Sequence, residues 1–377
     1  MDKFEIIVTT LFGLEALAAR EIRRLGYETT SVEDGKVCFM GDSAAVCRAN
    51  IWLRTAERIL IKIDEFTAVT FDELFEHTKK IEWYKWINKT DAFPVKGYSL
   101  KSTLASVRDC QSIIKKAIAD SLSNRYGISW FEESGSTYQI QFSIFKDKVT
   151  LMIDTSGEGL HKRGYRQVSN IAPLKETLAA AMVELSHWKY EYPLCDPFCG
   201  SGTIPIEAAM IKRNIAPGLN RTFAAQQFSQ IDNTLWDNAR EEAKSLIKNV
   251  PLEIYAFDID SDTVDIARSN AQKAGVGEFI TPQTGDARNI EFNISYGTII
   301  CNPPYGERIG EIKECEQLYK EIGKNFKKFD KWSYYIITSN ENFEKLFGKT
   351  ANKKRKLYNG MIKCNLYQFF GQRPPKK

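Results

Sequence analysis

Cys301 and Asn302 directly follow residues 297–300, an apolar run that predicts a buried strand. Pro303, Pro304 and Tyr305 come next. The Asn302 amide and the next carbonyl can accept hydrogen bonds from the exocyclic amine of a nucleobase, and Tyr305 can stack on the base. The prolines fix φ and offer no competing N–H donor. This arrangement suits methylation of a weakly nucleophilic amine, although prolines also end many strands that have no such role.

A glycine-containing turn further upstream is typical of a ligand-binding loop. Residues Asp196-Pro197-Phe198-Cys199-Gly200-Ser201-Gly202-Thr203 lead from a short apolar run into a helical pattern. Glycines let the main chain approach a ligand without a Cβ, and the start of a helix supplies free N–H groups. The chain lacks the GxxxxGK[ST] pattern of a phosphate-binding loop, which argues against ATP or GTP.

Two further strand-like runs end in carboxylates. Residues 254–257 lead into Asp258-Ile259, and residues 279–283 lead into Asp286-Ala287. The first carboxylate can accept hydrogen bonds from a ribose diol, and the second can accept from an adenine amino group. Each alone is more often a helix cap or a turn residue. The order of glycine turn, Asp258, Asp286 and Asn302 argues against coincidence.

This ordered set resembles the class I S-adenosylmethionine-dependent methyltransferases. Residues 159–166 and 172–179 also resemble the segment that leads into the catalytic part of THUMP-containing bacterial RNA methyltransferases. The nearest such family is that of the RlmL-like enzymes, which make N2-methylguanosine in large-subunit ribosomal RNA. The resemblance runs essentially end to end. The enterobacterial form carries a second methyltransferase module, so this chain, which stops at Lys377, looks like a stand-alone form.

The resemblance implies S-adenosylmethionine as cofactor and a guanosine N2 amine as methyl acceptor. It implies the methionine end of the cofactor for the glycine turn, the ribose for Asp258, the adenine for Asp286, and the target guanine for Asn302, Pro303 and Tyr305. The expected cofactor-binding residues are Asp196, Phe198, Gly200, Gly202, Thr203, Asp258, Ile259, Asp286, Ala287 and Asn302, and the expected catalytic residues are Asn302, Pro303, Pro304 and Tyr305.

Three other functions stay open. A transfer RNA guanosine could be the substrate, because other THUMP enzymes modify transfer RNA. A DNA adenine-N6 methyltransferase would use the same Asn-Pro-Pro-Tyr motif, but the chain has no recognisable DNA-reading motif. A non-catalytic RNA-binding assembly factor is the third possibility. Neither the modified nucleotide nor the oligomeric state can be read from motif spacing.

Length and composition bound the class of protein. The chain has 377 residues, 43% of them hydrophobic, which suits two or three compact units. No apolar run approaches the length of a membrane span, so we expect a cytoplasmic protein. The eight cysteines form no Cys-x-x-Cys pair and only three histidines are present, so we expect reduced, mostly buried thiols and no metal.

Positive charge is concentrated near the end of the chain. The net charge is only +4, yet residues 345–377 hold ten Lys or Arg and no Asp or Glu. We expect Lys353, Lys354, Arg355 and Lys356, ahead of an Asn-Gly hairpin turn at 359–360, to contact RNA. Lys162 and Arg163, together with His161 and Arg166, form a second candidate cluster. The last four residues suit a solvated tail better.

The first 155 residues indicate two α+β units. A ferredoxin-like unit is predicted from strands at 4–10, 36–39 and 59–63 with helices at 14–26 and 44–50. A helix at 106–126 and strands at 137–145 and 148–154 follow, in a region that resembles a THUMP domain. That resemblance implies RNA binding, with Lys101, Arg108, Lys115, Lys116, Lys146 and Lys148 as candidates. Residues 1–155 hold 21 basic and 22 acidic groups, so no broad positive face is guaranteed.

The predicted architecture has four parts. They are a ferredoxin-like domain at 1–64, a THUMP domain at 65–155, a linker at 156–165 with a hinge at 156–159, and a methyltransferase domain at 166–377. The last is expected to be an α/β Rossmann-like domain with a mostly parallel sheet, closed by antiparallel strands near 332–338 and 356–370.

Overall fold

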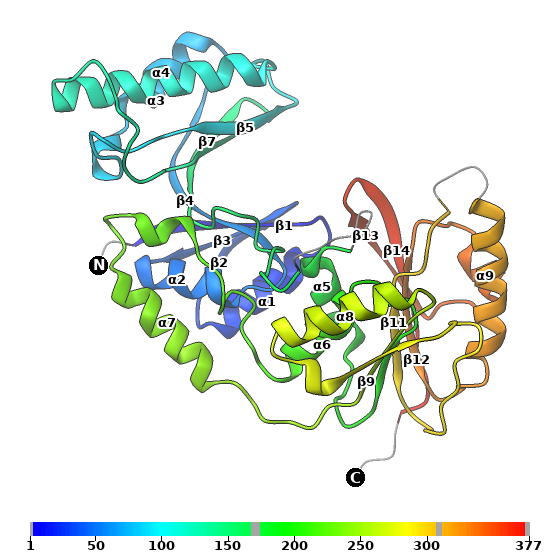
Figure 1. Cartoon of the computed structure of the whole chain (residues 1–377). Coiled ribbons are helices and arrows are strands. Elements are labelled where there is room, and N and C mark those ends of the chain that lie inside the picture. The colour runs from blue at the N-terminus through cyan, green and yellow to red at the C-terminus, as the bar shows by residue number, and fades with distance from the viewer. Residues whose placement is uncertain (1–2, 167–173, 307–310, 374–377) are drawn as a thin grey trace.

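Two seven-stranded sheets organise the chain (Figure 1). The computed structural model describes residues 3–166, 174–306 and 311–373. The first sheet has the order β2-β3-β1-β4-β7-β6-β5, and the second has the order β10-β9-β8-β11-β12-β14-β13. No helix in the described ranges is long and apolar enough to cross a membrane.

The first sheet is built by residues 4–154. Its strands are β1 (Phe4–Thr10), β2 (Thr29–Glu33), β3 (Lys36–Gly41), β4 (Ala56–Thr67), β5 (Val95–Leu100), β6 (Ile140–Phe145) and β7 (Lys148–Asp154). Its helices are α1 (Glu15–Arg24), α2 (Ser43–Trp52), α3 (Phe71–Lys80) and α4 (Val107–Tyr126). The predicted elements of the ferredoxin-like unit appear as β1, α1, β3, α2 and β4, whereas β2, α3 and β5 were not predicted.

Strand β4 belongs to both N-terminal units. It pairs antiparallel with β1 through its first residues and with β7 along most of its length, with a bulge between Lys62 and Asp64. The predicted division at residues 64 and 65 therefore falls inside a strand. The ferredoxin-like and THUMP parts share one continuous hydrogen-bonded sheet.

Helix α4 forms because a capped apolar stripe can be buried. The Ser106 hydroxyl accepts the Asp109 N–H at 3.4 Å, and Gly127 ends the helix with φ of +66°. The buried residues, Cys110, Ile114, Ala117, Ile118 and Leu122, lie at helical spacing on one face. Lys115 and Lys116 lie off this face and are exposed.

The second sheet is the predicted Rossmann-like sheet. Its strands are β8 (Leu194–Asp196), β9 (Ile254–Asp258), β10 (Ile280–Thr284), β11 (Thr298–Cys301), β12 (Ser333–Thr338), β13 (Lys353–Asn359) and β14 (Ile362–Phe369). β8 to β12 are parallel, and β14 and β13 add antiparallel at the β12 edge. The predicted Asn-Gly hairpin is confirmed, with Gly360 at φ of +61°. The predicted α/β fold is thus confirmed.

Helices cover both faces of this sheet (Figure 1). α5 (Glu176–Ser186), α6 (Thr203–Lys212) and α8 (Ser261–Lys273) pack in one apolar core, and α9 (Glu311–Phe326) and α10 (Phe343–Phe347) pack in the other. α7 (Asn233–Ser245) instead packs on α2 of the first sheet, where Arg48 forms an ion pair with Glu242 at 2.7 Å. The two halves of the chain are therefore interlocked.

Arg163 corrects one prediction of an RNA contact. Its side chain is 2% exposed and lies 3.3 Å from Glu207, which is fully buried. The same guanidinium donates to the carbonyls of Leu160 and Arg54, each at 2.6 Å. A guanidinium that is buried with all these partners is a structural group between the two halves of the chain and is not available to RNA.

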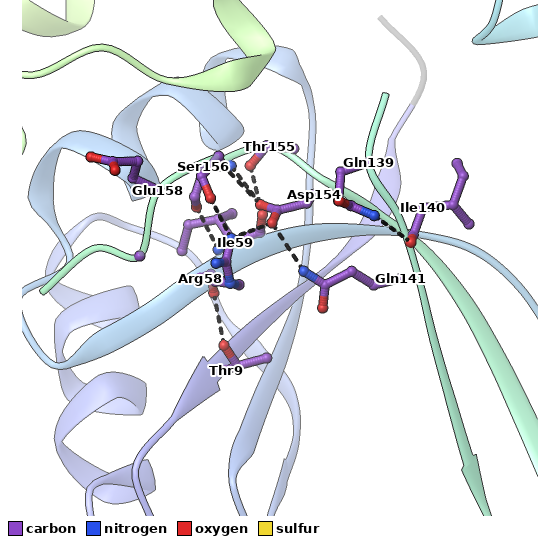
Figure 2. A network of polar contacts seen from close by, with 12 residues as sticks. Thr9, Arg58, Ile59, Gln139, Ile140, Gln141, Asp154, Thr155, Ser156 and Glu158 are labelled. Atoms are coloured by element: carbon purple, nitrogen blue, oxygen red, sulfur yellow. Dashed lines mark hydrogen bonds and ion pairs between the residues drawn. The ribbon is translucent and has the colours of Figure 1, made fainter. Parts of the chain in front are cut away.

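The predicted hinge at 156–159 is instead anchored (Figure 2). The carboxylate of Asp154 accepts the backbone N–H groups of Ser156 at 2.9 Å and Gly157 at 3.2 Å. Arg58 pairs with the same carboxylate and donates to the Gly157 carbonyl at 2.5 Å. Because the linker begins inside this network, its first residues are fixed beside the first residues of β4.

We predict that Arg163→Ala destabilises the protein by about 3–5 kcal/mol, because it leaves the Glu207 carboxylate buried without its cation. The measurement is the urea midpoint of unfolding, compared with Lys162→Ala. Lys162 is the exposed neighbour, paired only with exposed Glu158 at 2.9 Å, so its removal should cost less than about 0.5 kcal/mol. Equal midpoints for the two variants would contradict the assignment.

Candidate active site

Four strand ends meet at one edge of the second sheet. The order β10-β9-β8-β11 places these parallel strands side by side, so their carboxyl ends lie together. β8 ends at Asp196 and β9 at Asp258, while Asp286 and Asn302 follow β10 and β11 directly or nearly so. All four line one cavity of about 700 Å³.

Most of the predicted site residues line this cavity. They are Asp196, Phe198, Gly200, Thr203, Asp258, Ile259, Asp286, Ala287, Asn302 and Pro304. Gly202, Pro303 and Tyr305 lie next to lining residues but do not line the cavity themselves. The cavity also has walls that were not predicted, from Leu174, Arg288 and three residues of α9, Glu314, Cys315 and Leu318.

Asp196 brings a carboxyl group into a buried position. It is 1% exposed, one oxygen accepts the Phe198 N–H at 3.1 Å, and the other oxygen has no hydrogen-bond partner. Burial, with a smaller contribution from the charge of Asp258, raises the pKa of the Asp196 carboxyl well above its usual value. A buried oxygen without a partner at the wall of a cavity suits a ligand that brings a donor, preferably a cation.

The two predicted glycines have different tasks. Gly200 has φ of +51°, its N–H donates to Asp258 at 3.0 Å, and a Cβ there would meet no protein atom. Its bare backbone therefore borders open space in the cavity. Gly202, with φ of +84°, is the N-cap of α6, and a Cβ there would lie 3.2 Å from Ala267 of α8. Gly202 thus allows close packing behind the turn.

Asp286 has a partner that the sequence did not reveal. Arg288 contacts both carboxylate oxygens, at 2.5 Å in the closest approach, and also reaches Glu321 of α9 at 3.3 Å. Hydrogen bonding from Arg288 lowers the pKa of Asp286, so the carboxylate remains an ionised acceptor. The Asp258 carboxylate is held by the backbone instead, since it accepts the Asp260 N–H at 3.1 Å.

The Asn302 amide has a hydrogen-bond partner inside its own motif. The Tyr305 hydroxyl donates to the amide oxygen at 2.5 Å, and the Asn359 amide of β13 lies 3.5 Å from that hydroxyl. The Tyr305 hydroxyl uses one of the two lone pairs of the Asn302 oxygen, and the other can accept a nucleobase amine. Burial raises the pKa of Tyr305 far above its usual value, so the hydroxyl stays protonated.

Tyr319 of α9 fixes the other half of the motif. Its hydroxyl donates to the Pro304 carbonyl at 2.6 Å and lies 2.9 Å from the Thr338 hydroxyl at the end of β12. Tyr319 is fully buried. Tyr319 and Asn359 were not found from the sequence, because they reach the motif from elements outside it.

The predicted RNA-contacting cations lie on several elements rather than in this cavity. Of the residues on β13, Lys354 pairs with Glu344, Arg355 donates to the Gly13 carbonyl at 2.6 Å, and Lys353 and Lys356 are exposed. On α4, Lys115 pairs with Glu133 at 2.9 Å, Lys116 lies over the Phe75 ring, and Arg108 is exposed. Lys101, after β5, is exposed. RNA contact by these residues remains a prediction.

Comparison with family models identifies three consecutive regions. Residues 5–60 match the RlmL ferredoxin-like domain, residues 68–154 match the THUMP domain, and residues 163–368 match the RMKL-like methyltransferase domain. All three matches agree with the resemblance inferred from the motifs.

Named relatives cover the whole chain. A Bacillus subtilis protein named "Putative RNA methyltransferase YpsC" is 50% identical over 100% of this chain and 99% of the relative. The "Ribosomal RNA large subunit methyltransferase K/L" of Psychromonas ingrahamii is 33% identical over 97% of this chain. This chain spans about half of that relative, 50% of its length.

Solved structures share the entire fold. A Listeria monocytogenes protein described as a "predicted N6-adenine-specific DNA methylase" is 47% identical with a TM-score of 0.93, and the match covers 98% of this chain and 97% of that one. SMU.472, described as a putative methyltransferase complexed with SAH, is 41% identical with a TM-score of 0.93 over 100% of both chains. The chain therefore belongs to the RlmL-like family of THUMP-containing, S-adenosylmethionine-dependent RNA methyltransferases.

Proposed function

We propose that this protein transfers a methyl group from S-adenosylmethionine to the exocyclic N2 amine of a guanosine in large-subunit ribosomal RNA. The observation that carries the proposal is that Asn302, followed in the chain by Pro303 and Pro304, lines the same cavity as Asp196 and Asp258. The names of the K/L relatives support ribosomal RNA of the large subunit as the substrate. The choice of guanine N2 rests on the resemblance to the RlmL-like enzymes.

The residues of the cavity suit the cofactor. The oxygen of Asp196 that has no partner suits an ammonium group, and Asp258 offers acceptors to a ribose diol. Ile259, a lining residue that is 69% exposed, offers an apolar surface to a ring, and Asp286 offers an ionised acceptor beside it. When bound, S-adenosylmethionine supplies a methyl group activated by its sulfonium.

The Asn-Pro-Pro-Tyr motif would orient the target amine. The Asn302 oxygen and the next carbonyl accept its two N–H groups, which directs the nitrogen lone pair at the methyl group. Tyr319 holds the Pro304 carbonyl, so the motif is rigid before the base arrives. Positioning of this kind can supply on the order of 7–11 kcal/mol of barrier reduction. Asn302 acts as a neutral acceptor, and the proton of the methylated amine leaves to solvent.

We predict that Asn302→Ala and Asp258→Ala fail in different ways. Asn302→Ala should lower turnover by about 10²–10³-fold while cofactor affinity stays within about twofold, because it removes the orienting acceptor. Asp258→Ala should weaken cofactor binding by about 10–100-fold, since it removes charged hydrogen bonds. Calorimetric titration with S-adenosylmethionine and a tritium-transfer assay measure the two effects. Asp262→Ala, an exposed carboxylate in the first turn of α8, is the control. An equal loss of cofactor affinity in both variants would contradict these roles.

The substrate assignment predicts one product. Ribosomal RNA lacking the modification, transfer RNA and duplex DNA are each incubated with the protein and labelled cofactor, and the nucleosides are separated by chromatography with mass detection. We expect label in N2-methylguanosine from ribosomal RNA alone. N2-methylguanosine from transfer RNA would identify transfer RNA as the substrate. N6-methyladenine from DNA would identify the protein as a DNA adenine methyltransferase. No label in any sample would favour a non-catalytic assembly factor.

The raised pKa of Asp196 predicts a proton linkage. In the free protein this carboxyl retains its proton above the pH at which an ordinary aspartate ionises. An ammonium group favours the carboxylate, so cofactor binding should release a proton and should tighten as pH rises through this window, by up to about tenfold per pH unit. Calorimetry in buffers of different ionisation enthalpy measures the released proton. Asp196→Asn should abolish the release, and a parent protein that releases none would refute the linkage.

A further inference from the structure

The turn between β13 and β14 carries the most exposed large apolar side chain in the described ranges. Met361 is 98% exposed. Gly360 before it has φ of +61°, whereas Met361 does not have a positive φ, which is the pattern of a type II′ turn. Such a turn favours glycine at its first central position only, so the backbone does not restrict the residue type at 361. We call residues 359–362, closed by the pairing of Asn359 with Ile362, the hairpin tip.

The hairpin tip lies at the edge of the sheet that carries the site. β14 is antiparallel to β12, and β12 is parallel to β11, so β14 begins at the edge where β11 ends. Cys301 is level with Ile336, which is level with Tyr367. The hairpin tip comes several residues before Tyr367 and therefore projects beyond that level, as the red turn in Figure 1 shows. It thus extends past the strand end that Asn302 follows.

A chain of contacts joins the hairpin tip to the Asn302 motif. The Asn359 amide lies 3.5 Å from the Tyr305 hydroxyl, and this hydroxyl donates to the Asn302 oxygen at 2.5 Å. Met361 follows Asn359 by two residues. The exposed methionine is therefore carried just outside the group of residues that would hold the target base.

The first half of the chain supports the hairpin behind its tip. Arg355 donates to the Gly13 carbonyl at 2.6 Å, and Glu15 in turn accepts the Gly13 N–H at 2.9 Å. The ring of Phe12 meets the ring of Tyr358 edge-on, with 6.1 Å between the centroids. These contacts fix the strand that leads into the turn, so the fold sets the position of the hairpin tip relative to the Asn302 motif.

The surface beside the hairpin tip suits a nucleic acid. Phe12 is 54% exposed, and the ammonium of exposed Lys356 lies 5.3 Å from the centroid of the Tyr358 ring. Lys363 of β14 is also exposed, with Glu341 at 3.8 Å. Aromatic rings offer faces to bases, and lysines contact phosphates. An apolar tip with rings and cations beside it is therefore better suited to RNA than to a purely apolar partner.

A guanine that reaches Asn302 must first leave a stack. Asn302 lies at the wall of a cavity, so the target base has to be extruded from between its neighbours before it can enter. Extrusion leaves a gap between the flanking bases, and the lost stacking opposes it. An apolar side chain inserted between bases can fill such a gap. Methionine, which is unbranched and polarisable, fits gaps of irregular shape.

We propose that Met361 enters the gap that the target guanine leaves in the RNA stack and keeps that base extruded while the Asn302 motif holds it. Met361 contacts the bases beside the target and not the reacting atoms, so it is a positioning residue. The proposal rests on the proposed function for its choice of an RNA base as the ligand. It adds a residue outside the cofactor cavity on which access of the base to that cavity depends.

The first test uses the full-length protein and two short labelled RNA duplexes of the same sequence. One duplex is intact, and the other lacks a single guanine base at an abasic nucleotide. Fluorescence anisotropy measures the affinity for each. The abasic duplex offers a gap without the cost of extruding a base, so the parent protein should bind it about tenfold more tightly. Met361→Ser should bind both duplexes within about twofold, because a short polar side chain fills the gap poorly.

Two further variants serve as matched controls. Met361→Leu keeps an apolar side chain of similar size and should retain the preference for the abasic duplex. Met40→Ser removes another exposed methionine, 43% exposed on β3, and should also retain the preference. Met361→Ser should leave the urea midpoint of unfolding unchanged, because the side chain is almost fully exposed.

A parent protein that binds the two duplexes equally, or a Met361→Ser variant that keeps the preference, overturns the proposal. Self-association of the parent protein that Met361→Ser abolishes, while binding of both duplexes stays the same, assigns the hairpin tip to a second copy of the chain and also overturns it.

Methylation of large-subunit ribosomal RNA separates this proposal from the proposed function. Met361→Ser should lower kcat/KM for the RNA by about 10–100-fold and leave the affinity for S-adenosylmethionine unchanged. A protein that distinguishes the two duplexes through Met361 but methylates no RNA would refute the proposed function alone. A Met361→Ser variant that methylates ribosomal RNA as fast as the parent protein would refute the role of Met361 alone.

Discussion

The order of the parallel strands is the constraint on which the site depends. Because β10, β9, β8 and β11 are neighbours, each delivers one polar side chain to the same edge, and no long-range folding of loops is required to gather them. The edge retains a buried carboxyl oxygen without a partner at Asp196. Such a group costs about 1–3 kcal/mol, and a ligand that donates to it would recover that free energy. The unpaired carboxyl oxygen, which the fold holds at the cavity wall, thus favours binding of the cofactor.

The rigidity of the acceptor motif comes from distant parts of the chain. Tyr319 on α9 and Asn359 on β13 reach the motif from two different elements, and β13 also contacts Gly13 of the first half through Arg355. The antiparallel hairpin at the sheet edge therefore has two tasks. It extends the sheet, and it connects the N-terminal unit to the residues around Asn302.

Sequence patterns predicted those parts of the fold that carry a local signal. The glycine turn, the helix at 106–126 and the Asn-Gly hairpin were each predicted from spacing and residue type. β5 was not, because its apolar residues Tyr98 and Leu100 point away from the core and break the expected pattern. Arg163 was misjudged for a related reason. A basic residue in a polar segment gives no indication that it forms an ion pair with Glu207 in a buried interface.

The contacts around the site were the least predictable. Arg288 follows Asp286 by two residues, a spacing that could have suggested the pair, but Tyr319 and Asn359 lie 15 and 54 residues from the atoms they touch. Only the tertiary structure brings them together. The predicted roles of the strand-end residues rest on the family pattern, whereas the supports behind them come from packing.

Strand β4 connects the two N-terminal parts of the molecule. β4 runs through both N-terminal parts, and the anchored turn at Asp154 ties its first residues to the segment that enters the catalytic half. The two N-terminal parts are therefore one continuous sheet, and the start of the linker is held against it by hydrogen bonds. Two ligand contacts on this sheet, one in each part, would stay at a fixed spacing.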